Sequence, residues 1–167
     1  MNICGYIPES INEGKGVRAV LFISGCRHAC PGCFNQESWD FEAGEPFTAE
    51  LKSRILKEIA ANPLLDGITL CGGDPFFSAE ECVDFLSEFK ECCPDKDIWA
   101  YTGFTFEAVM KQPKLKNLAL MCDVIVDGKF NEREKDTSLP FRGSRNQRLV
   151  DVSRSVDKGQ VVEMNLS

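Results

Sequence analysis

Short apolar segments and amphipathic segments alternate along this chain, and this alternation limits the possible folds more than any other feature of the sequence. Four segments are rich in β-branched and aromatic residues and have the length of buried strands: 17–24, 67–73, 97–103 and 122–128. Segments 48–63 and 78–94 separate the first three strands and carry apolar residues at helical spacing. Strands that alternate with helices predict βα units and a mostly parallel sheet.

The two longer helices also have recognisable starts. Thr48 is positioned to cap the first helix, and Ser78 with Glu81 forms the capping-box pattern S-x-x-E at the second. Three more elements are expected, namely a short helix over 104–112 and strands over 147–153 and 161–165. With 167 residues the chain is too short for an eight-unit barrel, which needs about 250 residues. We therefore expect one α/β domain over residues 1–167, either an incomplete, open βα barrel or a small open sheet with flanking helices.

An unusual short motif follows each of the four predicted strands. The motifs are the cysteine-rich stretch at 25–35, GGDP at 72–75, YTG at 101–103 and DGKF at 127–130. In parallel α/β folds the carboxyl ends of the strands share one face, and active sites are built there. We therefore expect the four motifs to meet at one site.

The cysteine-rich stretch, GCRHACPGCFN, places Cys26, Cys30 and Cys33 in the pattern C-x3-C-x2-C. The chain has nine cysteines, an odd number that cannot pair completely as disulfides. Clustered cysteines in a reducing compartment more often bind metal or do redox chemistry. A structural zinc site is one interpretation, but it needs four protein ligands, and Cys71 or His28 would have to complete it.

Two other interpretations of the three cysteines remain open. Cys30 and Cys33 form a C-x-x-C motif of the kind that thiol oxidoreductases use. Alternatively the loop holds a 4Fe-4S cluster, which normally takes four cysteines, so that three thiolates leave one iron free to bind a substrate. Gly25, Pro31 and Gly32 permit the tight wrapping that such a loop needs.

Charge and composition exclude several classes of function. The formal net charge of −7 argues against general nucleic-acid binding, which needs a basic surface. No apolar run approaches the roughly 20 residues that cross a membrane. Residues 1–10 have neither the basic segment nor the apolar core of a signal peptide. We expect a cytoplasmic protein that acts neither on nucleic acid nor at a membrane.

The cysteine pattern after the first strand, with GGDP one unit later, resembles the radical S-adenosylmethionine (SAM) superfamily. This resemblance implies an open βα barrel of radical SAM type and a 4Fe-4S cluster held by Cys26, Cys30 and Cys33. It also implies that the open iron binds SAM, and that the reduced cluster cleaves SAM to methionine and a 5′-deoxyadenosyl radical. It implies no catalytic residue beyond the three cluster ligands.

The resemblance further implies SAM contacts in two segments. One segment wraps the last cysteine ligand and consists of Gly32, Cys33 and Phe34. The superfamily often has an aromatic residue before that cysteine, where this chain has Gly32, so we expect Phe34 to take over the contact with adenine. In the other segment, Gly72 and Gly73 let the backbone approach the methionine end of SAM, and Asp74 accepts a hydrogen bond from its ammonium.

Five stretches carry a closer resemblance: GKGVRAVLFISGCRHACPGCFN, CGGDP, YTGF, CDVIVDGKF and RGSRNQR. Together they are similar to the activating proteins of anaerobic ribonucleoside-triphosphate reductase, a family of glycyl-radical activases, over about residues 14–148. This implies the large reductase subunit as protein substrate, and an external electron donor such as flavodoxin or a thiol system. The alternatives are an activase of another glycyl-radical enzyme, a radical SAM enzyme for a small molecule and, more distantly, a non-catalytic zinc-binding module.

One segment differs in charge from the rest of the chain. Between Lys129 and Arg148 there are six basic and three acidic residues, a local balance of +3 in a chain of net charge −7. Such a segment is either a solvated loop or a docking surface for the reductase. In the second case Arg142 and Arg145 are the residues expected to carry the contact.

Overall fold

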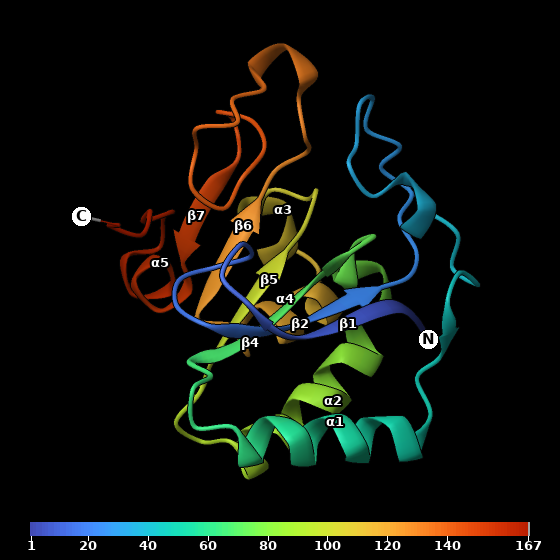
Figure 1. The fold of residues 1–167 in the computed structure, drawn as a ribbon. Coiled ribbons are helices and arrows are strands. Elements are labelled where there is room, and N and C mark those ends of the chain that lie inside the picture. Colours follow the sequence, from blue (N-terminus) through green and yellow to red (C-terminus); the bar gives the residue numbers. More distant parts are fainter. Residues whose placement is uncertain (167) are drawn as a thin grey trace.

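The computed structural model describes residues 1–166, which contain a seven-stranded mixed sheet (Figure 1). In spatial order the strands are β3 (Glu45–Pro46), β1 (Asn2–Ser10), β2 (Arg18–Ile23), β4 (Gly67–Gly72), β5 (Asp97–Tyr101), β6 (Val124–Asp127) and β7 (Arg148–Asp151). The four strands β2, β4, β5 and β6 pair in parallel, whereas β1, β3 and β7 pair antiparallel to their neighbours. The structure therefore confirms a mixed α/β fold with a mostly parallel central sheet.

The four predicted strands that precede the motifs are the four parallel strands. Of the two strands predicted near the carboxyl end, one forms and the other does not. β7 forms but runs antiparallel to β6, and it ends at Asp151, where α5 (Val152–Lys158) begins. Within the described residues, 161–165 makes only an isolated bridge between Glu163 and Val150, so the strand predicted there was wrong.

The predicted helices lie between the strands, as α1 (Ala49–Ala61), α2 (Ala79–Cys92) and α3 (Phe106–Met110), followed by an unpredicted α4 (Pro113–Ala119). Thr48 caps α1, because its side chain accepts a hydrogen bond from the Leu51 amide. The capping box at α2 was wrong: within residues 1–166 the Ser78 side chain makes no capping hydrogen bond. The chain enters α2 through the 3-10 helix η2 (Pro75–Ser78), so Ser78 lacks the extended backbone of a typical cap. No helix among the described residues is long and apolar enough to cross a membrane.

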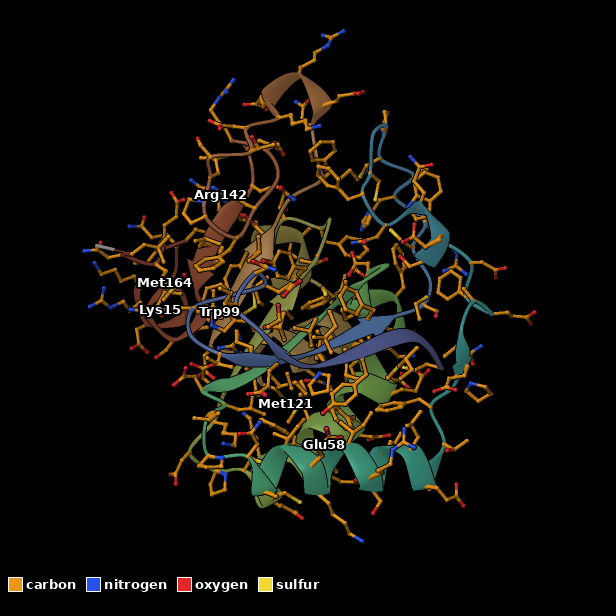
Figure 2. The ribbon with its side chains drawn as sticks, viewed as in Figure 1. Lys15, Glu58, Trp99, Met121, Arg142 and Met164 are labelled. Carbon is orange, nitrogen blue, oxygen red and sulfur yellow. The ribbon has the colours of Figure 1, made fainter. Side chains whose placement is uncertain are left out.

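The two faces of the sheet have different partners, because successive strand residues point to opposite sides. Side chains such as Leu21, Leu70 and Ile98 are buried in the large core shared with α1 to α4. On the opposite face Trp99 belongs to a second, smaller cluster, against which Met164 packs. Figure 2 shows Trp99 and Met164 close together, away from α1. Helices thus stabilise one face, while loops and the carboxyl-terminal segment cover the other.

Candidate functional site

The four strand-end motifs meet at one pocket, as the sequence predicts. A cavity of about 450 Å³ lies at the carboxyl ends of the parallel strands. The motif residues that line it include Cys26, Cys30 and Cys33 after β2, Gly72 and Gly73 at the end of β4, Tyr101 to Gly103 at the end of β5, and Gly128 and Phe130 after β6. In Figure 1 the loops after β2 and β6 rise from the same end of the sheet. Strand residues Phe22 and Cys71 add to the lining.

The cysteine loop is fixed at its base and leaves its thiols unpaired. At the base, the Gly25 amide donates to the Ser38 carbonyl at 2.8 Å. At the tip, the Cys33 amide donates to the Cys30 carbonyl at 3.2 Å, which forms a tight turn. Cys26, Cys30 and Cys33 are free, partly exposed thiols. All three are therefore available to a ligand that enters the pocket.

The chemistry of these thiols fits a multi-iron cluster. Burial raises the pKa of Cys26 to about 11 and also raises the pKa of Cys30, so these two thiols hold their protons until iron displaces them. Among the described residues, no three His, Cys, Asp or Glu side chains are gathered so as to hold a single metal ion. Three cysteine thiols that line one pocket suit a cluster, in which each cysteine binds a different iron atom.

The GGDP turn passes directly against the base of the cysteine loop. The Gly73 amide donates to the Ile23 carbonyl, and the Asp74 amide donates to the Gly25 carbonyl, both at 2.8 Å. A Cβ atom on Gly73 would lie 2.5 Å from the Gly25 carbonyl oxygen and 2.8 Å from that of Ser38. Only glycine allows the turn to pass this close to the cysteine loop. The backbone of Gly72 and Gly73 also forms part of the pocket wall, where the predicted SAM contact requires it.

The Asp74 side chain lies behind that wall. Asp74 is not among the described residues that line the pocket, and it is only 1% exposed. One carboxylate oxygen accepts hydrogen bonds from His28 Nε2 at 2.7 Å and from Thr102 Oγ1 and the Gly103 amide at 2.9 Å. The other accepts from the Phe76 amide at 2.9 Å. The predicted contact between Asp74 and the ammonium of SAM stays a prediction, and it would compete with these donors.

His28 has a role that the sequence did not indicate. The sequence offered this histidine, the only one in the chain, as a fourth zinc ligand. In the structure its side chain is 6% exposed, and the ring packs against Phe77 and Phe104 with centroid distances of 5.0 and 4.7 Å. One sequence signal could have indicated this role: His28 lies between Cys26 and Cys30, so any residue that bonds to its ring is connected to the cysteine loop.

The motif RGSRNQR braces the loop after β6. Three of its side chains bond to three consecutive residues of DGKF: Arg148 to the Asp127 carboxylate (2.6 Å), Gln147 to the Gly128 carbonyl (3.1 Å) and Asn146 to the Lys129 carbonyl (2.8 Å). Arg148 also pairs with Glu107, and its hydrogen bonds to the two carboxylates raise its pKa. The two motifs therefore interlock, and Arg148 is committed to the fold.

The other arginines of the motif differ in exposure. Arg142 is partly buried and lines the pocket, its Nη1 lies 4.0 Å from the Glu163 carboxylate, and its Nε has no hydrogen-bond partner among residues 1–166. Figure 2 shows Arg142 in the loop next to β7. Arg145 is exposed. Docking of the reductase on this segment stays a prediction, and Arg145 is the arginine of this motif that is best placed for it.

Comparison with known proteins adds a second line of evidence. A family model described as a 4Fe-4S single cluster domain matches residues 12–150. A protein of Pasteurella multocida is 41% identical over 150 residues, which cover 88% of this chain and 95% of the relative. A Haemophilus influenzae protein is also 41% identical, over 88% of this chain and 96% of its own. A protein of Enterobacteria phage T4 is 38% identical over 151 residues, 89% of this chain and 93% of its own.

All three relatives are named anaerobic ribonucleoside-triphosphate reductase-activating protein. This chain belongs to that family. The match to these activating proteins confirms the resemblance read from the five sequence stretches. The cluster domain of the family, over residues 12–150, includes all three cysteines of the loop, the GGDP turn and the whole of RGSRNQR.

Proposed function

We propose that this chain activates an anaerobic (class III) ribonucleoside-triphosphate reductase by generating a glycyl radical on it, through reductive cleavage of SAM at a 4Fe-4S cluster. One observation carries the proposal. Three free thiols and the glycine backbone of GGDP line the same pocket, in a chain that is 41% identical to named activating proteins over most of its length.

Cys26, Cys30 and Cys33 hold the cluster in this proposal. Cys71 lines the same pocket, but it belongs to β4 and is 6% exposed, so it is poorly placed to reach an iron atom. When bound, the reduced cluster supplies the electron that splits SAM into methionine and the 5′-deoxyadenosyl radical. An external donor, such as flavodoxin or a thiol system, provides this electron.

The chain itself binds and orients SAM and admits the protein substrate. The backbone of Gly72 and Gly73 lines the pocket and takes the methionine end in this proposal. Phe34 lines the pocket and is 63% exposed, which leaves its ring free to contact adenine. In this proposal Gly32 and Cys33 complete the contact along the cysteine loop, and the target glycine of the reductase enters at the strand ends.

The proposal includes the fold and the extent of the domain. The four parallel strands β2, β4, β5 and β6 then form the incomplete barrel of a small radical SAM domain over residues 1–167. Support comes from the helices on one face of the sheet and the pocket at the carboxyl ends of these strands.

Anaerobic reconstitution tests the proposal directly. Loaded with iron and sulfide, then reduced in the presence of SAM, the wild-type protein should form 5′-deoxyadenosine and give a glycyl-radical signal on the anaerobic reductase. Cys30→Ala should abolish both products. Cys71→Ala is the matched control, and it should keep the cluster and form 5′-deoxyadenosine.

Three results would count against the proposal. One zinc atom and no iron would favour the zinc-binding module. Loss of the cluster in Cys71→Ala would mean that the fourth iron is capped by the protein. Formation of 5′-deoxyadenosine without a radical on the reductase would favour another glycyl-radical enzyme or a small-molecule substrate.

A further inference from the structure

We propose that His28 and Asp74 form a positioning pair that holds the cysteine loop in register with the SAM-binding turn, without either side chain touching SAM. The inference rests on the proposed function, because the register matters only if a cluster and SAM share the pocket. It assigns to Asp74 a role different from the predicted contact with the ammonium.

Asp74 connects three of the strand-end motifs through one carboxylate. His28 comes from the cysteine loop, Thr102 and Gly103 come from the turn after β5, and Asp74 itself belongs to GGDP. The fourth donor, the Phe76 amide, fixes the carboxylate at the start of η2. Four donors on a carboxylate that is 1% exposed leave it little capacity for another partner, so its orientation is determined by the fold.

His28 is held equally firmly on its other sides. The ring lies between Phe77 and Phe104, and a Cβ atom on Gly103 would come within 2.5 Å of the ring. His28, Gly103 and Gly128 also line a second cavity of about 710 Å³. The three residues line both this cavity and the cysteine pocket, so removal of the ring would leave space at this part of the pocket wall.

This arrangement gives the pair a specific mechanical effect. His28 lies two residues from both Cys26 and Cys30, and Asp74 directly follows Gly73. One hydrogen bond of 2.7 Å therefore joins the part of the loop that carries the thiols to the backbone expected to receive the methionine end. Binding groups held in one fixed geometry lose less entropy when the ligand binds, and partners that orient metal ligands are worth about 10- to 100-fold in affinity or activity.

Two substitutions at His28 separate the hydrogen bond from the packing. His28→Met fills the space between the phenylalanines but cannot donate, whereas His28→Gln keeps a donor where Nε2 lies. We would measure SAM affinity by calorimetry on cluster-loaded, anaerobic protein, with iron content as the control. His28→Met should bind SAM about tenfold more weakly at unchanged iron content. His28→Gln should stay within about threefold of wild type.

A spectroscopic readout distinguishes positioning from general loss of stability. In the wild-type protein, SAM should change the electron paramagnetic resonance spectrum of the reduced cluster, and His28→Met should show a smaller change even at saturating SAM. Phe104→Leu, which loosens the packing but keeps the hydrogen bond, should show the full change. Equal SAM affinity in wild type and His28→Met, or equal losses in the Met and Gln variants, would overturn the proposal.

A double-mutant cycle with Asp74→Asn tests whether the two residues act as one unit. If they position the loop together, the double variant His28→Met/Asp74→Asn should bind SAM no more weakly than the weaker single variant. Additive losses would mean that Asp74 acts on SAM independently of His28, and would overturn the pairing. Failure of the proposed function looks different, because the wild-type protein itself would then hold no iron–sulfur cluster, bind no SAM, or form 5′-deoxyadenosine without placing a radical on the reductase.

Discussion

The loop after β2 and the loop after β6 form two walls of the same pocket, but they are held in different ways. The loop after β6 is braced internally, because side chains of RGSRNQR bond to DGKF and the Ser144 hydroxyl accepts from the Asn131 amide. The loop after β2 is anchored at its base and through His28. Its three cysteines keep free thiols.

This difference indicates that the two loops contribute to the pocket in different ways. The loop after β6 determines the shape of the pocket wall, since most of its polar side chains form hydrogen bonds within the loop and with RGSRNQR. The cysteine loop leaves its three thiols free, so in the proposed function it supplies the cluster ligands. Both motifs are equally conspicuous in the sequence, yet one is a structural motif and the other has a chemical role in the proposed function. Substitutions in the cysteine loop should therefore affect mainly cofactor binding, whereas substitutions in the loop after β6 should affect mainly stability.

The largest effect is expected where the cysteine loop meets the GGDP turn. In Gly73→Ala the new methyl group would lie 2.5 Å from the Gly25 carbonyl oxygen, so the loop and the turn must separate. Overpacking of this kind costs about 1–3 kcal/mol, and here it also displaces the base of the cluster loop. We expect a lower free energy of unfolding in chemical denaturation and loss of most of the reconstituted iron.

Gly5→Ala provides the control for this prediction. A Cβ atom on Gly5 would lie 3.7 Å from the Phe22 ring, an ordinary contact, so iron content should not change. If Gly73→Ala held a full cluster and bound SAM normally, the close approach of turn and loop would not matter for the site.

A smaller effect, on stability rather than on the cofactor, is expected in the braced loop. Arg148→Met would leave the Asp127 carboxylate, in a residue that is 1% exposed, with the Phe106 amide as a remaining donor. Removing one partner of such a pair should lower the free energy of unfolding by about 2 kcal/mol. Iron content and SAM affinity of the folded protein should change little.

The exposed Arg145 provides the matched comparison. Arg145→Met should alter the free energy of unfolding by no more than about 0.5 kcal/mol. If Arg148→Met left stability unchanged but abolished binding to the reductase, the motif would be a docking surface and the contrast between the two loops would fail.

Much of this arrangement could be predicted, because it follows from local patterns. The parallel strands are short apolar runs that end in glycine-containing motifs, and parallel pairing alone brings those motifs together. The antiparallel edge was harder to predict. In β1 the residues Gly5 and Pro8 interrupt the apolar pattern, and nothing local determines whether β7 runs parallel or antiparallel to β6.

The roles of individual polar residues could not be predicted, because they depend on contacts distant in sequence. Asp74 and His28 are 46 residues apart, and Arg148 and Asp127 are 21 apart. The sequence singled out GGDP and RGSRNQR, and residues of both motifs line the pocket. It could not show that Asp74 faces the interior, or that Arg148 serves the fold before any partner.

An effect on stability smaller than that of Arg148→Met is expected where the tips of the two loops meet. Phe34 is 63% exposed, its ring centroid lies 5.4 Å from that of Phe130, and Lys135 Nζ lies 5.2 Å from its ring. Exposed contacts of this kind contribute about 0.5–1 kcal/mol, so Phe34→Ala should hardly change the thermal unfolding midpoint. SAM affinity should nevertheless fall severalfold if the ring contacts adenine. Lys135→Met keeps the aromatic pair and removes only the cation, so it should bind SAM like wild type. Unchanged SAM affinity in Phe34→Ala would show that this tip closes the pocket without touching the cosubstrate, and adenine would then have to contact another residue of the lining, such as Phe130.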